Sequence, residues 1–129
     1  MRKVIQPRKL PDPRPRYSQG ILVTKPGKLL FIAGQTAVDA KGNIVGKGNI
    51  EAQAKQVFEN LKAVLKKAGG SIENIVKTTT YITDIKYREG LNKIRRQYYK
   101  STAPTSTLVV VKGLANKDYL VEIEGIAVL

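Results

Sequence analysis

Two carboxylates stand two residues apart near the end of this 129-residue sequence, at Glu122 and Glu124. They fall in residues 119–128, a largely apolar stretch that predicts a strand. Side chains two residues apart on a strand share one face of its sheet, so both carboxylates face the same way. A carboxylate can act as a general base, but this spacing alone favours an ordinary polar stripe.

The chemistry open to this chain is narrowed by two missing residue types, because the sequence contains neither cysteine nor histidine. Thiolate nucleophiles, disulfides and cysteine-ligated metals are excluded, as is the commonest general base. Any catalysis must therefore use Asp, Glu, Lys, Arg, Tyr, Ser or Thr side chains, backbone groups or bound water. A histidine-based triad and a zinc site are therefore excluded.

The first half of the sequence predicts an arm followed by a hairpin. Residues 1–16 hold six basic side chains and four prolines, which suit an extended arm on the surface of a single domain spanning residues 1–129. Residues 20–24 and 28–33 flank Lys25-Pro26-Gly27, whose Pro-Gly pair fits a type II turn and predicts a hairpin. A further turn at residues 39–43 leaves room for only a short strand at 44–45.

Two amphipathic helices are predicted in the middle of the chain. The first has apolar residues at helical spacing from Ile50 to Ala68, with Asn49 as its N-cap. After a β-branched strand at residues 75–83, Asp84 is expected to cap the second helix. Its inner face is predicted to be Tyr87, Leu91, Ile94 and Tyr98, while Arg95 and Arg96 are predicted to be solvated.

The order of elements predicts an α+β fold, with two helices packed on one face of a single mixed β-sheet. The strand that follows the second helix is continuously apolar from Leu108 to Val111, so we expect both of its faces to be buried. Two helices cover only one face of a sheet. The other face is most simply covered by further copies of the same chain, which predicts an oligomer.

Four segments together resemble the Rid family of reactive-intermediate deaminases, also called YjgF-like proteins. They are Tyr17-Ser18-Gln19-Gly20, Ala33-Gly34-Gln35, residues 103–111 and residues 119–128. The likeness runs from end to end of the chain. It implies a homotrimer of chorismate-mutase-like subunits with sites in the clefts between subunits. It also implies hydrolysis of imines and enamines to a 2-oxo acid and ammonia, without a cofactor.

The resemblance assigns roles to individual residues. Glu122 matches the acidic residue that holds the attacking water, whereas Glu124 is left structural. Tyr17, Gly34 and Asn92 match residues that line the family's pocket and contact substrate. Each of these three also has an ordinary interpretation, namely packing under the arm, a bend at a strand end and an exposed helix residue.

The sequence departs from the family pattern at two positions. The arginine that grips the substrate carboxylate falls here on Ser106, and a pocket serine falls on Ala33. A serine hydroxyl offers one neutral hydrogen bond where arginine offers a charged, planar fork. We therefore expect deaminase activity to be weak, altered or absent, unless Arg14 or Arg16 beside Tyr17 supplies another cation.

The formal net charge of +13 leaves a second function open, that of a basic RNA-binding protein or translation inhibitor with ribonuclease-like activity. A positive surface attracts nucleic acid without regard to sequence. The alternative is a solvated, lysine-rich surface typical of thermophile composition. With no apolar run long enough for a membrane span or signal peptide, we expect a cytoplasmic protein without a membrane partner. A small-molecule cleft protein is the interpretation we favour.

Overall fold

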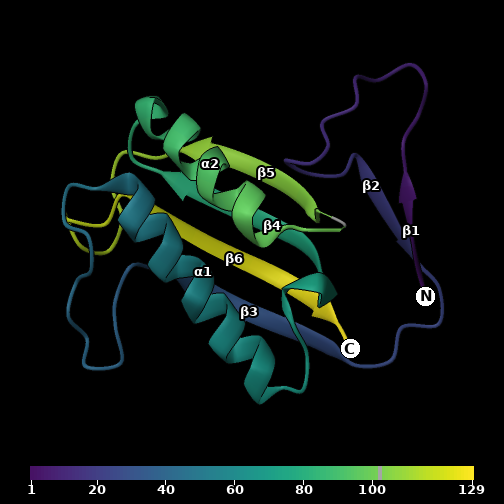
Figure 1. Ribbon diagram of the computed structural model, residues 1–129, viewed down its shortest axis with the longest axis horizontal. Helices are drawn as coiled ribbons and strands as arrows, with labels where there is room; N and C mark the ends of the chain where they lie inside the picture. The colour runs from purple at the N-terminus through teal and green to yellow at the C-terminus, as the bar shows by residue number, and fades with distance from the viewer. Residues whose placement is uncertain (102) are drawn as a thin grey trace.

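The core of the fold is a four-stranded sheet with the strand order β3-β6-β4-β5 (Figure 1). The computed structural model describes residues 1–101 and 103–129. The four strands are β3 (Leu29–Gln35), β4 (Ile75–Ile82), β5 (Thr105–Val110) and β6 (Val121–Val128). β4 and β5 are parallel, whereas β6 is antiparallel to both β3 and β4. The sheet is therefore mixed, as predicted.

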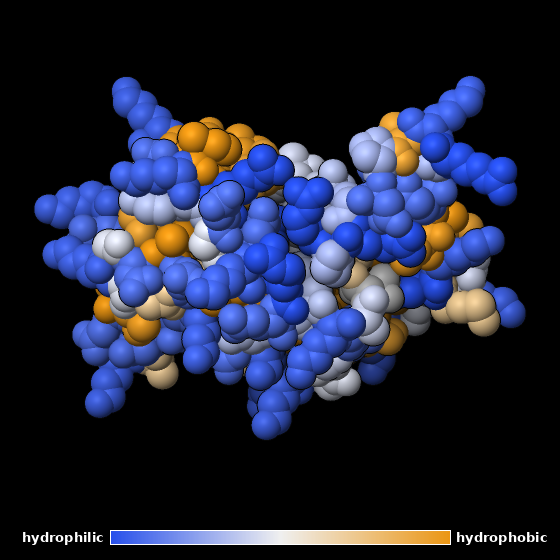
Figure 2. Space-filling view, turned by 45° about the horizontal axis from the view of Figure 1, so that its top comes forward, coloured by the Kyte–Doolittle hydropathy of each residue, from blue (hydrophilic) through white to orange (hydrophobic). Residues whose placement is uncertain are grey.

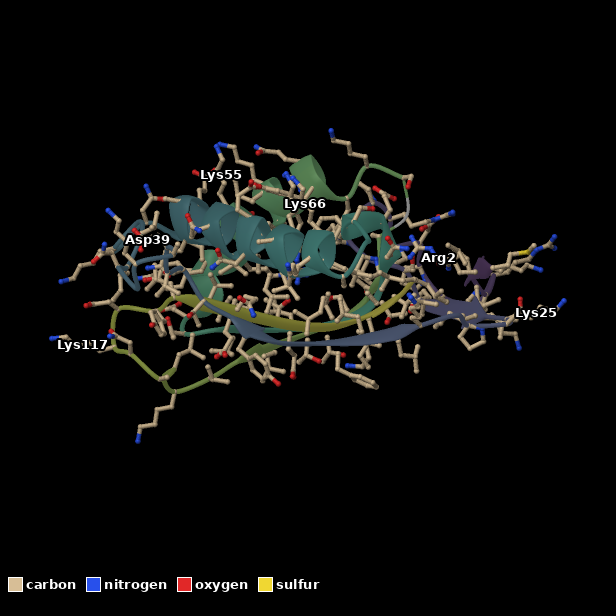
Figure 3. The ribbon with its side chains drawn as sticks, turned by 90° about the horizontal axis from the view of Figure 1, so that it is seen from below. Arg2, Lys25, Asp39, Lys55, Lys66 and Lys117 are labelled. Carbon is tan, nitrogen blue, oxygen red and sulfur yellow. The ribbon has the colours of Figure 1, made fainter. Side chains whose placement is uncertain are left out.

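Two helices, α1 (Ile50–Lys67) and α2 (Arg88–Tyr98), pack on the same face of this sheet (Figures 1 and 3). The side chain of Asn49 accepts a hydrogen bond from the backbone N of Ala52 at 3.0 Å, which confirms the predicted N-cap of α1. The ring of Phe58 on α1 stacks on Tyr98 of α2, with centroids 4.7 Å apart. The α+β fold with both helices on one face is confirmed.

The start of α2 differs from the prediction. Asp84 caps a separate 3₁₀ turn, η2 (Ile85–Tyr87), by accepting a hydrogen bond from the backbone N of Lys86 at 2.9 Å. A second such turn, η1 (Ile72–Asn74), precedes β4. None of the helices in the two described ranges is both long and apolar enough to cross a membrane.

The predicted hairpin between residues 20–24 and 28–33 is wrong. β2 (Gly20–Val23) pairs with β1 (Arg2–Ile5) in a separate two-stranded sheet, which stands to one side of the main sheet in Figure 1. Lys25, the first residue of the predicted turn, has a φ of 53°, in the left-handed region. The backbone of Lys28 exchanges hydrogen bonds of 2.9 Å with Leu129 instead, so β6 rather than β2 accompanies β3.

The sheet face opposite the helices has no second layer in the described part of the chain (Figure 3). It carries the exposed apolar side chains of Phe31 (71 % exposed), Leu29 (56 %) and Val109 (38 %). We call this the open face. β5 is an edge strand whose Val109 and Val110 are exposed in the single chain, so the burial of both of its faces stays a prediction about the oligomer.

Candidate functional site

A pocket of about 290 Å³ lies between the arm, α2 and β5, and we call it the α2 pocket. Three of the predicted site residues, Tyr17, Asn92 and Ser106, line it together. Its remaining lining residues are Arg16, Ile85, Arg88, Arg95 and Leu108. Residues far apart in sequence are thus brought together by the packing of α2 beside the edge strand.

The arm reaches this pocket through Ser18. Its backbone N donates a 2.9 Å hydrogen bond to the carbonyl of Pro104, and its buried hydroxyl donates to the carbonyl of Ala103. These bonds hold the neighbouring Tyr17 beside the start of β5. Arg16, the residue before Tyr17, also lines the α2 pocket. Arg14 forms an ion pair with Asp12 and does not line the pocket.

The side chain of Arg95 is the most unusual feature of the α2 pocket, because it is only 5 % exposed. Nη2 donates hydrogen bonds to Oγ1 of Thr80 at 2.8 Å and to Oγ of Ser106 at 3.3 Å. Nη1 donates to Oδ1 of Asn92 at 3.3 Å. Burial lowers the pKa of Arg95, Tyr99 raises it, and the positive charges of Arg88 and Arg16 lower it further.

The prediction that Arg95 is solvated is therefore wrong, although the neighbouring Arg96 is exposed. Arg95 follows Leu91 by four residues, which is the spacing of side chains on one face of a helix. The helical periodicity contained this signal. The prediction of a solvated side chain instead followed the charge of Arg95, because an arginine is rarely buried unless it is paired.

Glu122 lies on the open face of the sheet, apart from the α2 pocket. It borders a shallow hollow of about 440 Å³ together with Tyr81, Glu124 and residues 113–115. The hydroxyl of Tyr81 donates a 2.7 Å hydrogen bond to Oε1 of Glu124. That hydrogen bond is the main cause of the raised pKa of Tyr81, with burial and the charges of both glutamates adding to it. Glu124 thus has a partner within the sheet.

Gly34 lies directly beneath the side chain of Glu122. A β carbon at position 34 would lie 2.8 Å from Cδ and 3.0 Å from Cγ of Glu122, and closer still to Oε1. Real β carbons do not approach other atoms so closely. The absence of a side chain at Gly34 therefore lets Glu122 lie across the irregular end of β3. Ala33 and Gln35 flank it, and Nε2 of Gln35 donates to the carbonyl of Ala33 at 3.1 Å.

The predicted site residues thus fall into two groups on opposite sides of the sheet. Ser106 pairs with Thr78 on the helix-covered side, whereas Glu122 pairs with Tyr81 on the open face. A ligand in the α2 pocket of one chain cannot reach Glu122 of the same chain across the sheet. Residues 1–101 and 103–129 contain no group of three acidic side chains suited to a metal ion.

A broader hollow of about 650 Å³ lies between the ends of α1 and α2 and holds none of the predicted site residues. It is lined by lysines, Glu59, Glu73 and the exposed side of Tyr98, among others. The α2 pocket is smaller, but charged and polar side chains converge in it, which makes it the better candidate for a ligand site.

Comparison with known sequences gives a family match over nearly the whole chain. The family model described as Endoribonuclease L-PSP matches residues 8–129. A RutC family protein of Pyrococcus horikoshii is 40 % identical over 127 residues, which cover 98 % of each chain. The human protein named 2-iminobutanoate/2-iminopropanoate deaminase is 34 % identical over 128 residues, covering 99 % of this chain and 90 % of the human one.

Comparison with solved structures gives the same family as the comparison with sequences. A Rid-family protein of unknown function from Yersinia pestis, YyfB, superimposes with a TM-score of 0.90 at 32 % identity, over 99 % of this chain and 98 % of that one. RidA from an Antarctic Psychrobacter gives a TM-score of 0.74 at 34 % identity, over 98 % of this chain and 99 % of that one.

Proposed function

This chain belongs to the Rid family, whose sequence model is described as Endoribonuclease L-PSP, and we propose that it acts as a cytoplasmic homotrimer. Each cleft between subunits binds a small metabolite and hydrolyses its imine or enamine group. Water adds to the carbon of the C=N bond, the resulting carbinolamine expels ammonia, and a carbonyl group remains. The human relative named as an iminobutanoate and iminopropanoate deaminase supports this class of reaction.

The observation that carries the proposal is the division of the site between two sides of the sheet. Ser106 and Glu122 cannot serve one ligand within one chain, because the sheet separates them. In a cyclic oligomer, one surface of each subunit meets a different surface of the next. The open face of one subunit and the α2 pocket of its neighbour would then form one cleft.

The exposed apolar side chains on the open face support the same assembly. Phe31 and Leu29 are more than half exposed in the single chain. Burial of apolar area is favourable at about 25 cal/mol per Å², so covering these side chains with another copy stabilises the oligomer. A sheet face with such residues is typical of an interface rather than of a solvent-facing surface.

Within this cleft, we assign Glu122 the role of holding the attacking water. Its carboxylate accepts a hydrogen bond from that water and takes up a proton as the C–O bond forms. Tyr17 offers an apolar wall with a polar tip, and Asn92 offers an amide to the ligand. Ser106 and Ala33 themselves offer fewer polar groups to the ligand than the family pattern does.

A coupled assay tests the catalytic part of the proposal. An amino-acid oxidase generates the imine, and the loss of the imine is followed with and without this protein. Glu122→Gln should reduce the rate by about 10²-fold or more, since general base catalysis is worth that much. Glu124→Gln is the matched control, because Glu124 lies on the same strand and face. Equal rates for wild type and Glu122→Gln would contradict the assignment.

The net charge of +13 and the family model's description as an endoribonuclease favour a second candidate, a basic RNA-binding protein. The lysines labelled in Figure 3 project from α1 and from loops at both ends of the molecule. Hydrophilic side chains likewise cover much of the face in Figure 2, between separate hydrophobic patches. Charge spread in this way supports non-specific attraction rather than recognition of a sequence.

A further inference from the structure

Arg95 is a buried cation that has only neutral partners in the described part of the chain. Its guanidinium is held by Thr80, Ser106 and Asn92, and none of the described aspartates or glutamates forms an ion pair with it. Burying a charge is costly unless an opposite charge compensates it. A folded chain that keeps such a group has a reason to do so beyond packing.

Two further arginines line the same pocket, Arg16 from the arm and Arg88 from the start of α2. Like charges gathered around one small hollow repel each other, and the lowered pKa of Arg95 reflects this as well as its burial. A bound anion would relieve the repulsion among all three. The α2 pocket therefore has the charge of an anion-binding site.

The guanidinium of Arg95 is also held in a fixed position. It donates three hydrogen bonds to acceptors on β4, on β5 and on its own helix, and these bonds use only some of its N–H donors. Arg95 also lines the α2 pocket, so its remaining donors are the groups that a ligand there would use. A guanidinium whose orientation is already fixed loses little conformational freedom when it binds a carboxylate, and its planar fork matches the two carboxylate oxygens.

We propose that Arg95 is the carboxylate clamp of this protein, replacing from α2 the arginine that the sequence lacks at position 106. Ser106 has a positioning role, because its hydroxyl accepts a hydrogen bond from the clamp. The accepted ligand is a small 2-imino or 2-oxo carboxylate. This inference rests on the proposed function for the reaction, but the anion site itself does not depend on catalysis.

Binding of 2-oxobutanoate, a stable analogue of an imino acid, tests the clamp directly. Titration calorimetry on the full-length wild-type protein should show binding that Arg95→Gln weakens at least tenfold, because a charge-assisted hydrogen bond is lost. Arg96→Gln is the matched control, since Arg96 is the next residue on the same helix but is exposed and lies outside the α2 pocket. It should bind as wild type does.

The uncharged 2-oxobutanamide is the matched ligand, and it should bind weakly and equally to wild type and Arg95→Gln. Thermal unfolding gives a second measurement: 2-oxobutanoate should raise the Tm of wild type but not that of Arg95→Gln. A merely structural Arg95 would lower the Tm of the free protein when it is replaced but would leave the ligand-induced rise in Tm unchanged.

Equal affinity of wild type and Arg95→Gln for 2-oxobutanoate would overturn the inference, as would equal affinity of wild type for the acid and the amide. Failure of the proposed function gives a different pattern. Wild type would then bind 2-oxobutanoate through Arg95 but hydrolyse no imine. Hydrolysis that persists unchanged in Arg95→Gln would leave the function standing and remove the clamp.

Discussion

Nη2 of Arg95 lies 3.3 Å from Oγ of Ser106, so a helix residue places its charge beside the strand position where the deaminase pattern has an arginine. The two residues are complementary, since one donates the hydrogen bond that the other accepts. The clamp proposal treats the serine at position 106 and the buried Arg95 as a pair that together takes the place of one arginine.

Exchanging these two residues should preserve binding. Ser106→Arg alone places a second cation against Arg95 and should lower the Tm without strengthening the binding of 2-oxobutanoate. The double variant Arg95→Ser with Ser106→Arg moves a single guanidinium to the strand, and it should bind within about tenfold of wild type. Calorimetry on the three proteins measures this. Tighter binding by Ser106→Arg alone would show that the clamp is absent from wild type.

Gly34→Ala should reduce imine hydrolysis while the fold persists. The added methyl group occupies the place of the Glu122 side chain, which is flexible and can swing away. A displacement of about 1 Å in a catalytic group can lower the rate by about 10²-fold. The oxidase-coupled assay measures the loss, and circular dichroism checks the fold. In a Glu122→Gln background the same substitution should cause no further loss; an additional large loss would show that Gly34 acts independently of Glu122.

The native mass of the protein should be that of a homotrimer at micromolar concentration. Phe31→Asp puts a charge among the exposed apolar side chains of the open face and should dissociate the oligomer. Leu10→Asp, at an exposed leucine of the arm, should leave it intact. Light scattering coupled to size exclusion distinguishes these outcomes, and a monomeric wild type would remove the basis of the shared cleft.

Binding to RNA, where it occurs, should be electrostatic and independent of sequence. Filter binding at increasing salt concentration should show affinity falling steeply and equally for unrelated RNAs, because each neutralised phosphate releases counterions. Selective binding that survives high salt would favour the RNA-binding candidate over the metabolite cleft.

Most of the architecture could be predicted because it follows from local patterns. Apolar spacing and Asn49 predicted α1, β-branched residues predicted β4, and largely apolar stretches predicted β5 and β6. The partner of β2 could not be predicted, because pairing with β1 or β3 uses the same backbone groups. The structure pairs β2 with β1.

The candidate site was predicted as a set of residues but not as an arrangement. Alternation along a strand assigns Glu122 to a face, but it does not say which face the helices cover. The burial of Arg95 was missed because it depends on acceptors contributed by other elements, Thr80 on β4 and Ser106 on β5. The sequence contains both acceptors, but it does not show that they lie beside Arg95 in the fold.

Subunit complementation tests most directly whether each site is shared between two chains. Glu122→Gln removes the group on the open face, and Ser106→Glu blocks the α2 pocket with a carboxylate beside Arg95; each variant alone should be inactive in the imine assay. When the two are unfolded, mixed in equal amounts and refolded together, roughly a quarter of the clefts receive both intact surfaces and activity should recover to that level. A co-refolded mixture no more active than the separate variants would contradict a site built from two subunits.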